Sequence, residues 1–173
     1  AWAGAVPVAW DDWMSLTQLG SGEALSGSAY VLWELRLPRI AFALLIGAAL
    51  GLCGALTQGL FRNPLADPGL LGVSSGAACA AALSIVFLGS VQQLLPASAR
   101  FWLLPAAAFA GALSVCFLLD RVARWLTAES IAGLLLTGIA LNALTAAVIG
   151  LCTYLASDEQ LRNLSFWTLG SLA

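Results

Sequence analysis

The stretch that decides the fold runs from Tyr30 to Gly76 and reads YVLWELRLPRIAFALLIGAALGLCGALTQGLFRNPLADPGLLGVSSG. Two arginines that flank a proline come first, and an uncharged apolar segment, Ile40–Phe61, follows them. A short polar break then leads into a second long apolar segment. A bilayer span needs about 20 predominantly apolar residues. The order therefore predicts a membrane hairpin with a charged rim and a structured turn.

The composition is that of a membrane protein. Apolar residues make up 61% of the sequence and charged residues only 9%, whereas an ordinary soluble domain carries about 25% charged residues. A chain so poor in charge could not cover a water-facing surface, so lipid is the expected solvent. The net charge of −2 argues against nucleic acid as a partner.

Four segments have the length and composition of a membrane span, which predicts an all-α, polytopic membrane protein. They are Ile40–Phe61, Gly69–Ser90, Phe101–Leu119 and Ser130–Ala156. The expected division is an interfacial N-terminal segment over residues 1–28, a transmembrane portion over 29–156 and a surface helix over 157–173. Ser157 with Gln160 three residues later is a capping-box pattern, which predicts that the surface helix covers about Asp158–Trp167.

The polar break after the first span has the chemistry of a turn. Asn63-Pro64 and Asp67-Pro68 each place a good N-cap residue before a proline, which suits the first position of a helix. A short helical turn is expected at Pro64–Ala66, and a new helix is expected to begin at Pro68.

Small residues recur at helical spacing in the first two spans. Such stripes let helix backbones approach closely where the hydrophobic effect cannot drive association. They indicate packing within one bundle, with a pathway or a second subunit as the alternative. The candidate packing glycines are Gly47, Gly51, Gly59, Gly72 and Gly76.

The fourth span carries a polar face at steps of three and four residues, formed by Gly138, Asn142, Thr145 and Thr153. Asn142 is the most polar residue at mid-span, and it can hydrogen-bond a neighbouring helix. The alternative is that this face lines a translocation pathway.

Arg36 and Arg39 are three residues apart and would share one face of a helix, and Pro38 between them favours a helix start nearby. Two guanidinium groups at a rim make a good receptor for carboxylates. Simple interfacial anchoring is the alternative for this pair.

The sequence offers no catalytic constellation, no metal site and no cofactor motif. It has no histidine, which excludes a histidine-based triad or relay in this chain. It also lacks the G-x-x-x-x-G-K-[ST] loop that binds ATP phosphates. The spans carry no charge, which argues against a proton-coupled transporter because such proteins keep ionisable groups at depth.

The stretches RLPR, RNPLADPGLLG and SSGA occur here in an order and spacing that resemble the permease subunits of ABC importers for vitamin B12, haem and iron–siderophores. The pieces ALNAL, TYLASDEQLR and FWTLGSL look most similar to haem permeases. The resemblance implies that the four spans correspond to helices 2–5 of a ten-helix permease, so residues 1–173 would be part of a longer chain.

The resemblance also implies partners and an orientation. The arginine counts on the two sides are nearly balanced, so the positive-inside rule does not decide orientation. The family places Arg36 and Arg39 outside, where they receive acidic residues of a periplasmic substrate-binding protein, and the Asn63–Pro68 turn in the cytoplasm. Cytoplasmic ATPase subunits, a second permease copy forming a homodimer, and the bacterial inner membrane are implied as well.

The function expected is therefore that of a permease subunit of an ATP-driven importer for haem or a related iron chelate. An iron–siderophore or vitamin B12 permease of the same family is the alternative substrate assignment. A non-transporting scaffold that uses its small-residue stripes for helix association is a different class of function. An integral-membrane enzyme is disfavoured by the lack of histidine and of clustered carboxylates.

Overall fold

The computed structural model describes residues 6–15, 26–89, 95–127 and 130–171, and the described elements are helical. They fall into two compact units that divide between Leu52 and Cys53. The all-α class predicted from the sequence is confirmed. Three helices are long and apolar enough to cross a membrane, namely Gly27–Phe61, Ala97–Leu126 and Ile131–Leu155, and Val73–Phe87 is a shorter apolar helix.

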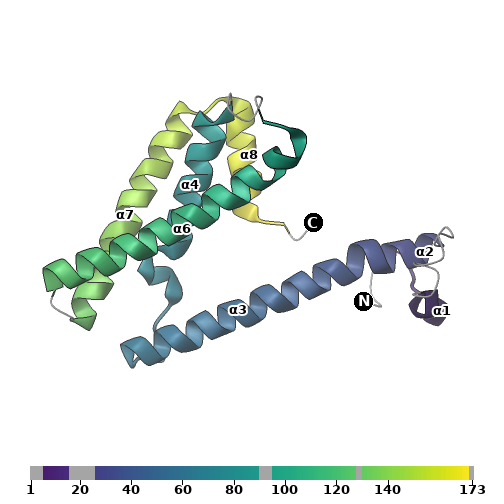
Figure 1. The fold of residues 1–173 in the computed structure, drawn as a ribbon, viewed down its shortest axis with the longest axis horizontal. Coiled ribbons are helices and arrows are strands. Elements are labelled where there is room, and N and C mark those ends of the chain that lie inside the picture. The colour runs from purple at the N-terminus through teal and green to yellow at the C-terminus, as the bar shows by residue number, and fades with distance from the viewer. Residues whose placement is uncertain (1–5, 16–25, 90–94, 128–129, 172–173) are drawn as a thin grey trace. The chain divides into compact units, whose positions relative to one another are not determined.

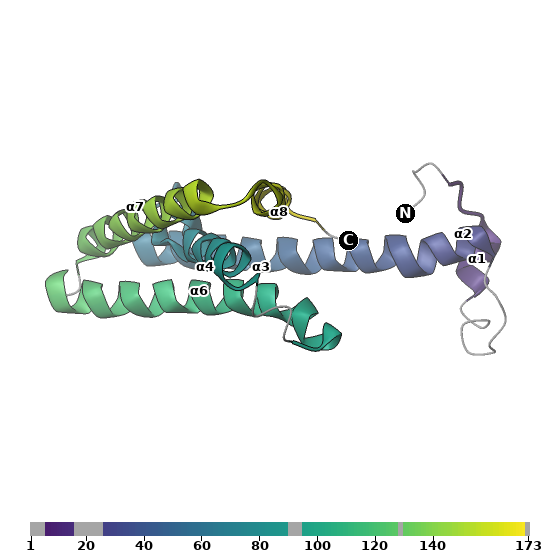
Figure 2. The ribbon, with the colours of Figure 1, turned by 90° about the horizontal axis from the view of Figure 1, so that it is seen from above.

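The first unit contains α1 (Trp10–Met14), α2 (Gly27–Tyr30), the π-helical segment η2 (Val31–Arg36) and the start of α3 (Leu37–Phe61). Figure 2 shows α2 leading directly into α3, with α1 beside α2. The Ser26 hydroxyl accepts a hydrogen bond from the Ala29 amide and so caps this long helix.

The expectation that a helix begins near Pro38 is wrong, because the helix starts at Gly27 and continues through the proline. Proline has no N–H to donate to the carbonyl four residues earlier, and its ring clashes with that carbonyl. The preceding turn is wider than an α-helical turn, with the Leu37 amide bonded to the carbonyl of Leu32, five residues back. The π-helical turn is how this helix accommodates Pro38.

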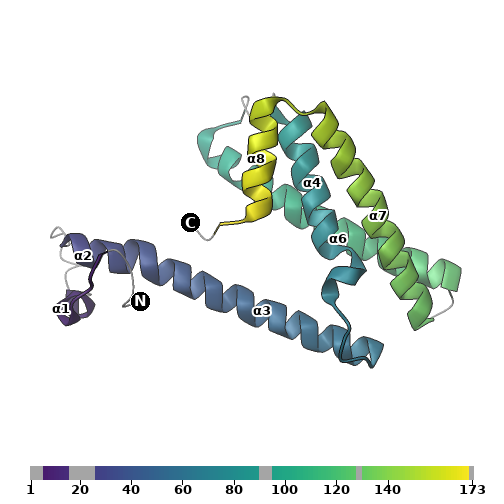
Figure 3. The same cartoon turned by 180° about the vertical axis from the view of Figure 1, so that it is seen from behind.

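The second unit contains the end of α3 and then η3 (Pro68–Leu71), α4 (Val73–Phe87), α6 (Ala97–Thr127), α7 (Ile131–Leu155) and α8 (Asp158–Leu169). α4 packs against α6, α7 and α8. Figure 1 shows α6 crossing α4 and α7 obliquely, and Figure 3 shows α7, α4 and α8 side by side from the other face. A small buried cluster joins α6 and α7 through Val115, Leu119 and Leu141.

The second predicted span, Gly69–Ser90, is broken near its start. A 3₁₀ turn covers Pro68–Leu71, Gly72 adopts a left-handed conformation with φ of 81°, and α4 proper has 15 residues. At 1.5 Å per residue α4 is about 22 Å long, and four 3₁₀ residues add about 8 Å. The two pieces together therefore approach the roughly 30 Å thickness of the hydrocarbon core.

A helix follows the fourth span as predicted, and its location at the membrane surface stays a prediction. α8 begins with the expected capping box, in which the Ser157 hydroxyl accepts from the Gln160 amide and the Gln160 side chain accepts from the Ser157 amide. Its half-buried residues Gln160, Leu161, Leu164 and Trp167 fall on one helical face.

Candidate functional site

The two arginines of the RLPR stretch lie in different settings. Arg36 ends the π-helical segment and is half-buried, and its Nη2 atom donates to the carbonyl oxygen of Val6 at 2.6 Å. Arg39 lies in the first turn of α3, and its side chain is exposed. Arg36 thus holds the N-terminal segment, whereas the docking role of the exposed Arg39 stays a prediction.

Residues Val6–Ser15, here called the N-terminal clasp, are tied to α2 and η2 mainly through Asp12. Its carboxylate accepts hydrogen bonds from the Ala9 amide at 2.8 Å, the Ser28 hydroxyl at 2.9 Å and the Ser26 hydroxyl at 3.2 Å. The Trp33 indole donates to the Asp12 carbonyl oxygen at 2.9 Å. The Ala9 amide, followed by the two hydroxyls, holds the pKa of Asp12 below its ordinary value against the opposing effect of burial.

The turn between the first two spans is built as its residue types predict. The Asn63 side-chain oxygen accepts from the Leu65 amide at 2.9 Å, and the Asp67 carboxylate accepts from the Gly69 amide at 2.8 Å. Pro64 lies in the resulting turn, and Pro68 opens η3. The turn begins at Arg62, which has a φ of 48° where glycine is usual.

Asn142 joins α7 to the broken start of the second span. Its Nδ2 atom donates to the carbonyl oxygens of Gly69 at 3.1 Å and Leu70 at 3.4 Å, and its Oδ1 atom accepts from the Ser75 hydroxyl at 2.6 Å. Irregular backbone at membrane depth needs such partners because lipid offers none. The geometry is that of the predicted hydrogen bond to a neighbouring element.

The other three members of the polar face differ from one another. Gly138 lies against the backbone of Leu70, so closely that a Cβ atom there would collide with the Leu70 carbonyl oxygen. Thr145 is buried and bonds to carbonyls of its own helix. Thr153 is exposed, bonds to the Ile149 carbonyl and lines a cavity. One helix face therefore combines packing contacts at its start with a cavity wall at its end.

The two glycine stripes have different surroundings. A Cβ atom at Gly76 would lie 2.8 Å from the carbonyl oxygen of Gly111, and one at Gly72 would lie 3.1 Å from the Val115 side chain. These glycines let α4 approach α6 closely. Cβ atoms at Gly47, Gly51 and Gly59 would meet nothing within 4 Å among the described residues, so the packing role of the first stripe stays a prediction.

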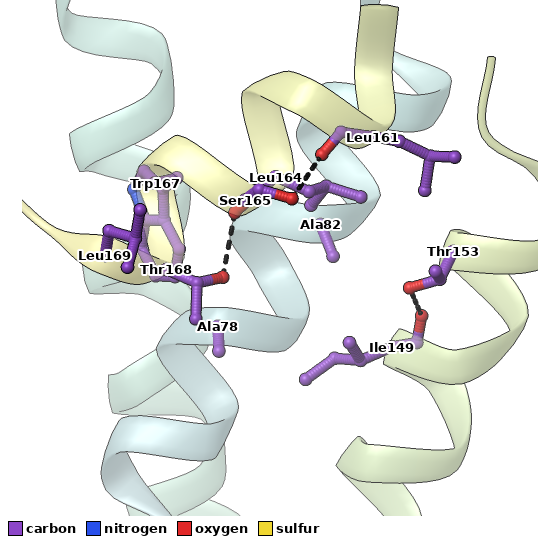
Figure 4. A pocket seen from close by; sticks show the side chains of 10 residues that line it. All are labelled: Ala78, Ala82, Ile149, Thr153, Leu161, Leu164, Ser165, Trp167, Thr168 and Leu169. Atoms are coloured by element: carbon purple, nitrogen blue, oxygen red, sulfur yellow. Dashed lines mark hydrogen bonds between the residues drawn. The ribbon is translucent and has the colours of Figure 1, made fainter. Parts of the chain in front are cut away.

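A cavity of about 480 Å³ lies where α8 faces α4 and α7. Figure 4 shows Ala78 and Ala82 of α4 and Ile149 and Thr153 of α7 around this cavity, together with one face of α8. The α8 residues that line the cavity are Leu161, Leu164, Ser165, Trp167, Thr168 and Leu169. The walls are mostly apolar, with three hydroxyl groups, so the cavity suits an apolar guest better than a charged one.

Three groups that organise these sites were not singled out from the sequence. Asp12 lies in no recognisable motif, Ser75 belongs to the SSGA stretch but has no local pattern that predicts its contact, and the partners of both are distant in the chain. Gln160 was assigned only to the capping box, although its Nε2 atom also donates to the carbonyls of Ile85 and Val86 in α4. Among the described residues no group of three or more His, Cys, Asp or Glu side chains could hold a metal ion.

Comparison with known proteins identifies one family over the whole chain. The FecCD transport family matches residues 1–173. The chain is 46% identical over 139 residues to the hemin transport system permease protein HmuU of Yersinia pestis, covering 80% of this chain and 40% of that protein. It is 42% identical over 150 residues to the vitamin B12 import system permease protein BtuC of Klebsiella pneumoniae, covering 86% of this chain and 43% of the relative.

A solved structure of a metal-chelate type ABC transporter in an inward-facing conformation matches with a TM-score of 0.68 and 32% identity. The match covers 88% of this chain and 46% of that one, so the chain spans less than half the length of each of these relatives. With a family match that runs from the first residue to the last, the chain belongs to the FecCD transport family.

Proposed function

We propose that this chain is part of the permease subunit of an ATP-driven importer that moves haem or a related iron chelate across the bacterial inner membrane. The observation that carries the proposal is the family match over all 173 residues, together with 46% identity to a hemin permease. The substrate assignment is the finer part of this proposal, since a vitamin B12 permease is 42% identical.

The geometry supports a translocation pathway that does not bind the cargo through charged side chains and that depends on separate ATPase subunits for energy. Asp120 and Arg124, which pair at 2.8 Å, lie at the end of α6 and are exposed, and the central parts of the long helices carry no charged side chain. This chain contributes no histidine and a single methionine, Met14, outside the spans. Such walls offer few ligands for iron, so the cargo would pass as an intact chelate. ATP hydrolysis would occur in separate cytoplasmic subunits, with two permease copies alternating between outward-facing and inward-facing states.

We assign the outer docking contact chiefly to Arg39. Its exposed guanidinium can donate two parallel hydrogen bonds to a carboxylate of a periplasmic binding protein. Arg36 would act beside it by holding the N-terminal clasp through the Val6 carbonyl. The Asn63–Pro68 turn would lie at the cytoplasmic side, where it connects the first two spans.

The test is uptake by the full-length permease, reconstituted in proteoliposomes with its ATPase and its binding protein. Haem, cobalamin and a ferric siderophore are supplied separately, and an ATPase variant without the P-loop lysine is the control. The proposal expects ATP-dependent uptake of haem in excess of the other two. Uptake of cobalamin or the siderophore alone would move the assignment to that substrate. ATPase activity that no cargo stimulates, with no uptake, would support the scaffold alternative.

A further inference from the structure

Helix α8 is joined to α7 by a link that does not fix its direction. Ala156 and Ser157 are both extended, with ψ values of 144° and 165°, so the helical hydrogen bonds of α7 do not continue into α8. The position of α8 over the cavity must therefore come from contacts of its own, chiefly those with α4. Apolar contacts of Leu161 and Leu164 at the cavity are one part of this attachment.

The side chain of Gln160 supplies a directional contact. Its Oε1 atom accepts from the Ser157 amide at 2.9 Å, and its Nε2 atom donates to the carbonyl oxygens of Ile85 at 3.2 Å and Val86 at 3.0 Å. A primary amide has two N–H donors, so each of the two carbonyls can receive one. These carbonyls belong to the last turn of α4, where the helix itself leaves carbonyls unsatisfied.

One side chain thus caps two helices that are more than 70 residues apart in the chain. The amide oxygen points to the positive N-terminus of α8, and the amide nitrogen points to the negative C-terminus of α4, so both ends match the helix dipoles. A polar cavity of about 360 Å³ lies beside this contact, with Arg100 and Glu159 among its lining residues. Water can therefore compete for the two carbonyls if the amide leaves.

We propose that Gln160 is a positioning residue that fastens α8 to the end of α4, and that α8 acts as a lid over the cavity between α4 and α7. Releasing the Nε2 contact would let α8 move away and would open the cavity at the α8 side. That this lid controls the passage of cargo rests on the proposed function. The fastening itself follows from the hydrogen bonds and the cavity.

Two substitutions separate the fastening from the capping of α8. Gln160→Glu keeps an acceptor for the Ser157 amide, because glutamate is a normal capping-box residue. It removes both donors and places a carboxylate against the two α4 carbonyls. Ser157→Ala does the opposite: it removes the hydroxyl that caps α8 and leaves the Gln160 amide in contact with α4.

The readout is the maleimide reaction of a cysteine at position 82 (Ala82→Cys), which lines the cavity beneath α8 and is 1% exposed as alanine. The full-length permease with its ATPase is placed in lipid nanodiscs, and peptide-resolved mass spectrometry separates this site from the native cysteines. We expect Gln160→Glu to raise the labelling rate about five- to thirtyfold, the effect of losing one or two neutral hydrogen bonds. Ser157→Ala should stay within about twofold of the parent.

Hydrogen exchange on the same samples gives an independent measurement. Gln160→Glu should accelerate exchange in both α8 and the last turn of α4, whereas Ser157→Ala should accelerate it at the start of α8 only. Unchanged labelling in Gln160→Glu, or equal increases in both variants, would overturn the proposal. Cargo uptake is measured in parallel, so a permease that moves no haem but shows these labelling differences would refute the transport assignment and leave the lid intact.

Discussion

Replacing Asn142 by leucine tests whether this side chain supports the broken start of the second span. The substitution keeps a similar volume but removes the donor to Gly69 and Leu70 and the acceptor for Ser75. Two of these groups keep another hydrogen-bond partner after the substitution. The Ser75 hydroxyl also bonds to the Gly72 carbonyl at 2.9 Å, and the Gly69 carbonyl also accepts from the Gly72 amide at 3.2 Å.

The Leu70 carbonyl has no hydrogen-bond partner other than Asn142 among the described residues. Leu70 is 38% exposed, but its carbonyl oxygen faces Gly138 of α7. A carbonyl left without a partner against an apolar helix costs about 1–3 kcal/mol, and measured side-chain hydrogen bonds in membrane proteins average about 0.6 kcal/mol. Asn142→Leu should therefore lower the free energy of unfolding by about 1–3 kcal/mol, and not by the sum over three full hydrogen bonds.

The assay is steric trapping of the full-length permease in bicelles, which reports an equilibrium free energy of unfolding. Thr153→Val is the matched control, because its hydroxyl is exposed and, within the described part of the chain, bonds only to the Ile149 carbonyl of its own helix. The control should fall within about 0.5 kcal/mol of the parent. If Asn142→Leu is equally mild, the amide does not support the break, and the reasoning from the hydrogen bonds is refuted.

Three further predictions concern other parts of the chain. Gly76→Ala should cost about 1–3 kcal/mol in the same assay, since its Cβ atom would meet Gly111; Gly150→Ala, in open space on α7, should cost nothing, and equal effects would remove the packing argument. Asp12 has a lowered pKa. Its contribution to the stability of the N-terminal clasp is therefore complete above the ordinary aspartate pKa of about 3.9 and is lost as pH falls through the lowered pKa. Hydrogen exchange of the clasp in Asp12→Asn should lack this acid transition, and an unchanged transition would assign it to another group. Arg39→Glu should weaken binding-protein docking at low salt, whereas basal ATPase activity should persist; undiminished docking would make Arg39 an interfacial anchor.

The sequence predicted the features that depend on local composition. Uncharged runs of helix length gave the spans, Ser157 with Gln160 gave the start of α8, and the Asn-Pro and Asp-Pro pairs gave the turn. Each of these rests on contacts within a few residues, which a pattern of neighbours can specify.

The features that escaped prediction depend on partners far apart in the chain. Asn142 and Ser75 are separated by 67 residues and Gln160 and Ile85 by 75, so no local pattern indicates which groups meet. The break at Gly72 was missed because a glycine in an apolar run fits a packing stripe as well as a left-handed residue. Pro38 was misjudged because a proline usually ends a helix, and the alternative of widening the preceding turn depends on the contacts that hold it.

The π-helical turn before Pro38 also constrains which insertions and deletions this chain can tolerate. Deleting one residue between Val31 and Arg36 would give the turn regular α-helical spacing and would leave α2 close to its present rotation about the axis of α3, because the wide turn holds one extra residue. A deletion in the regular part of the helix between the clasp contacts and α3 would instead rotate everything before it by about 100° relative to α3. The wide turn is therefore the place in this helix where the loss of one residue disturbs the alignment of the N-terminal clasp least. A helical wheel drawn without interruption from Gly27 to Phe61 would assign the clasp to the wrong side.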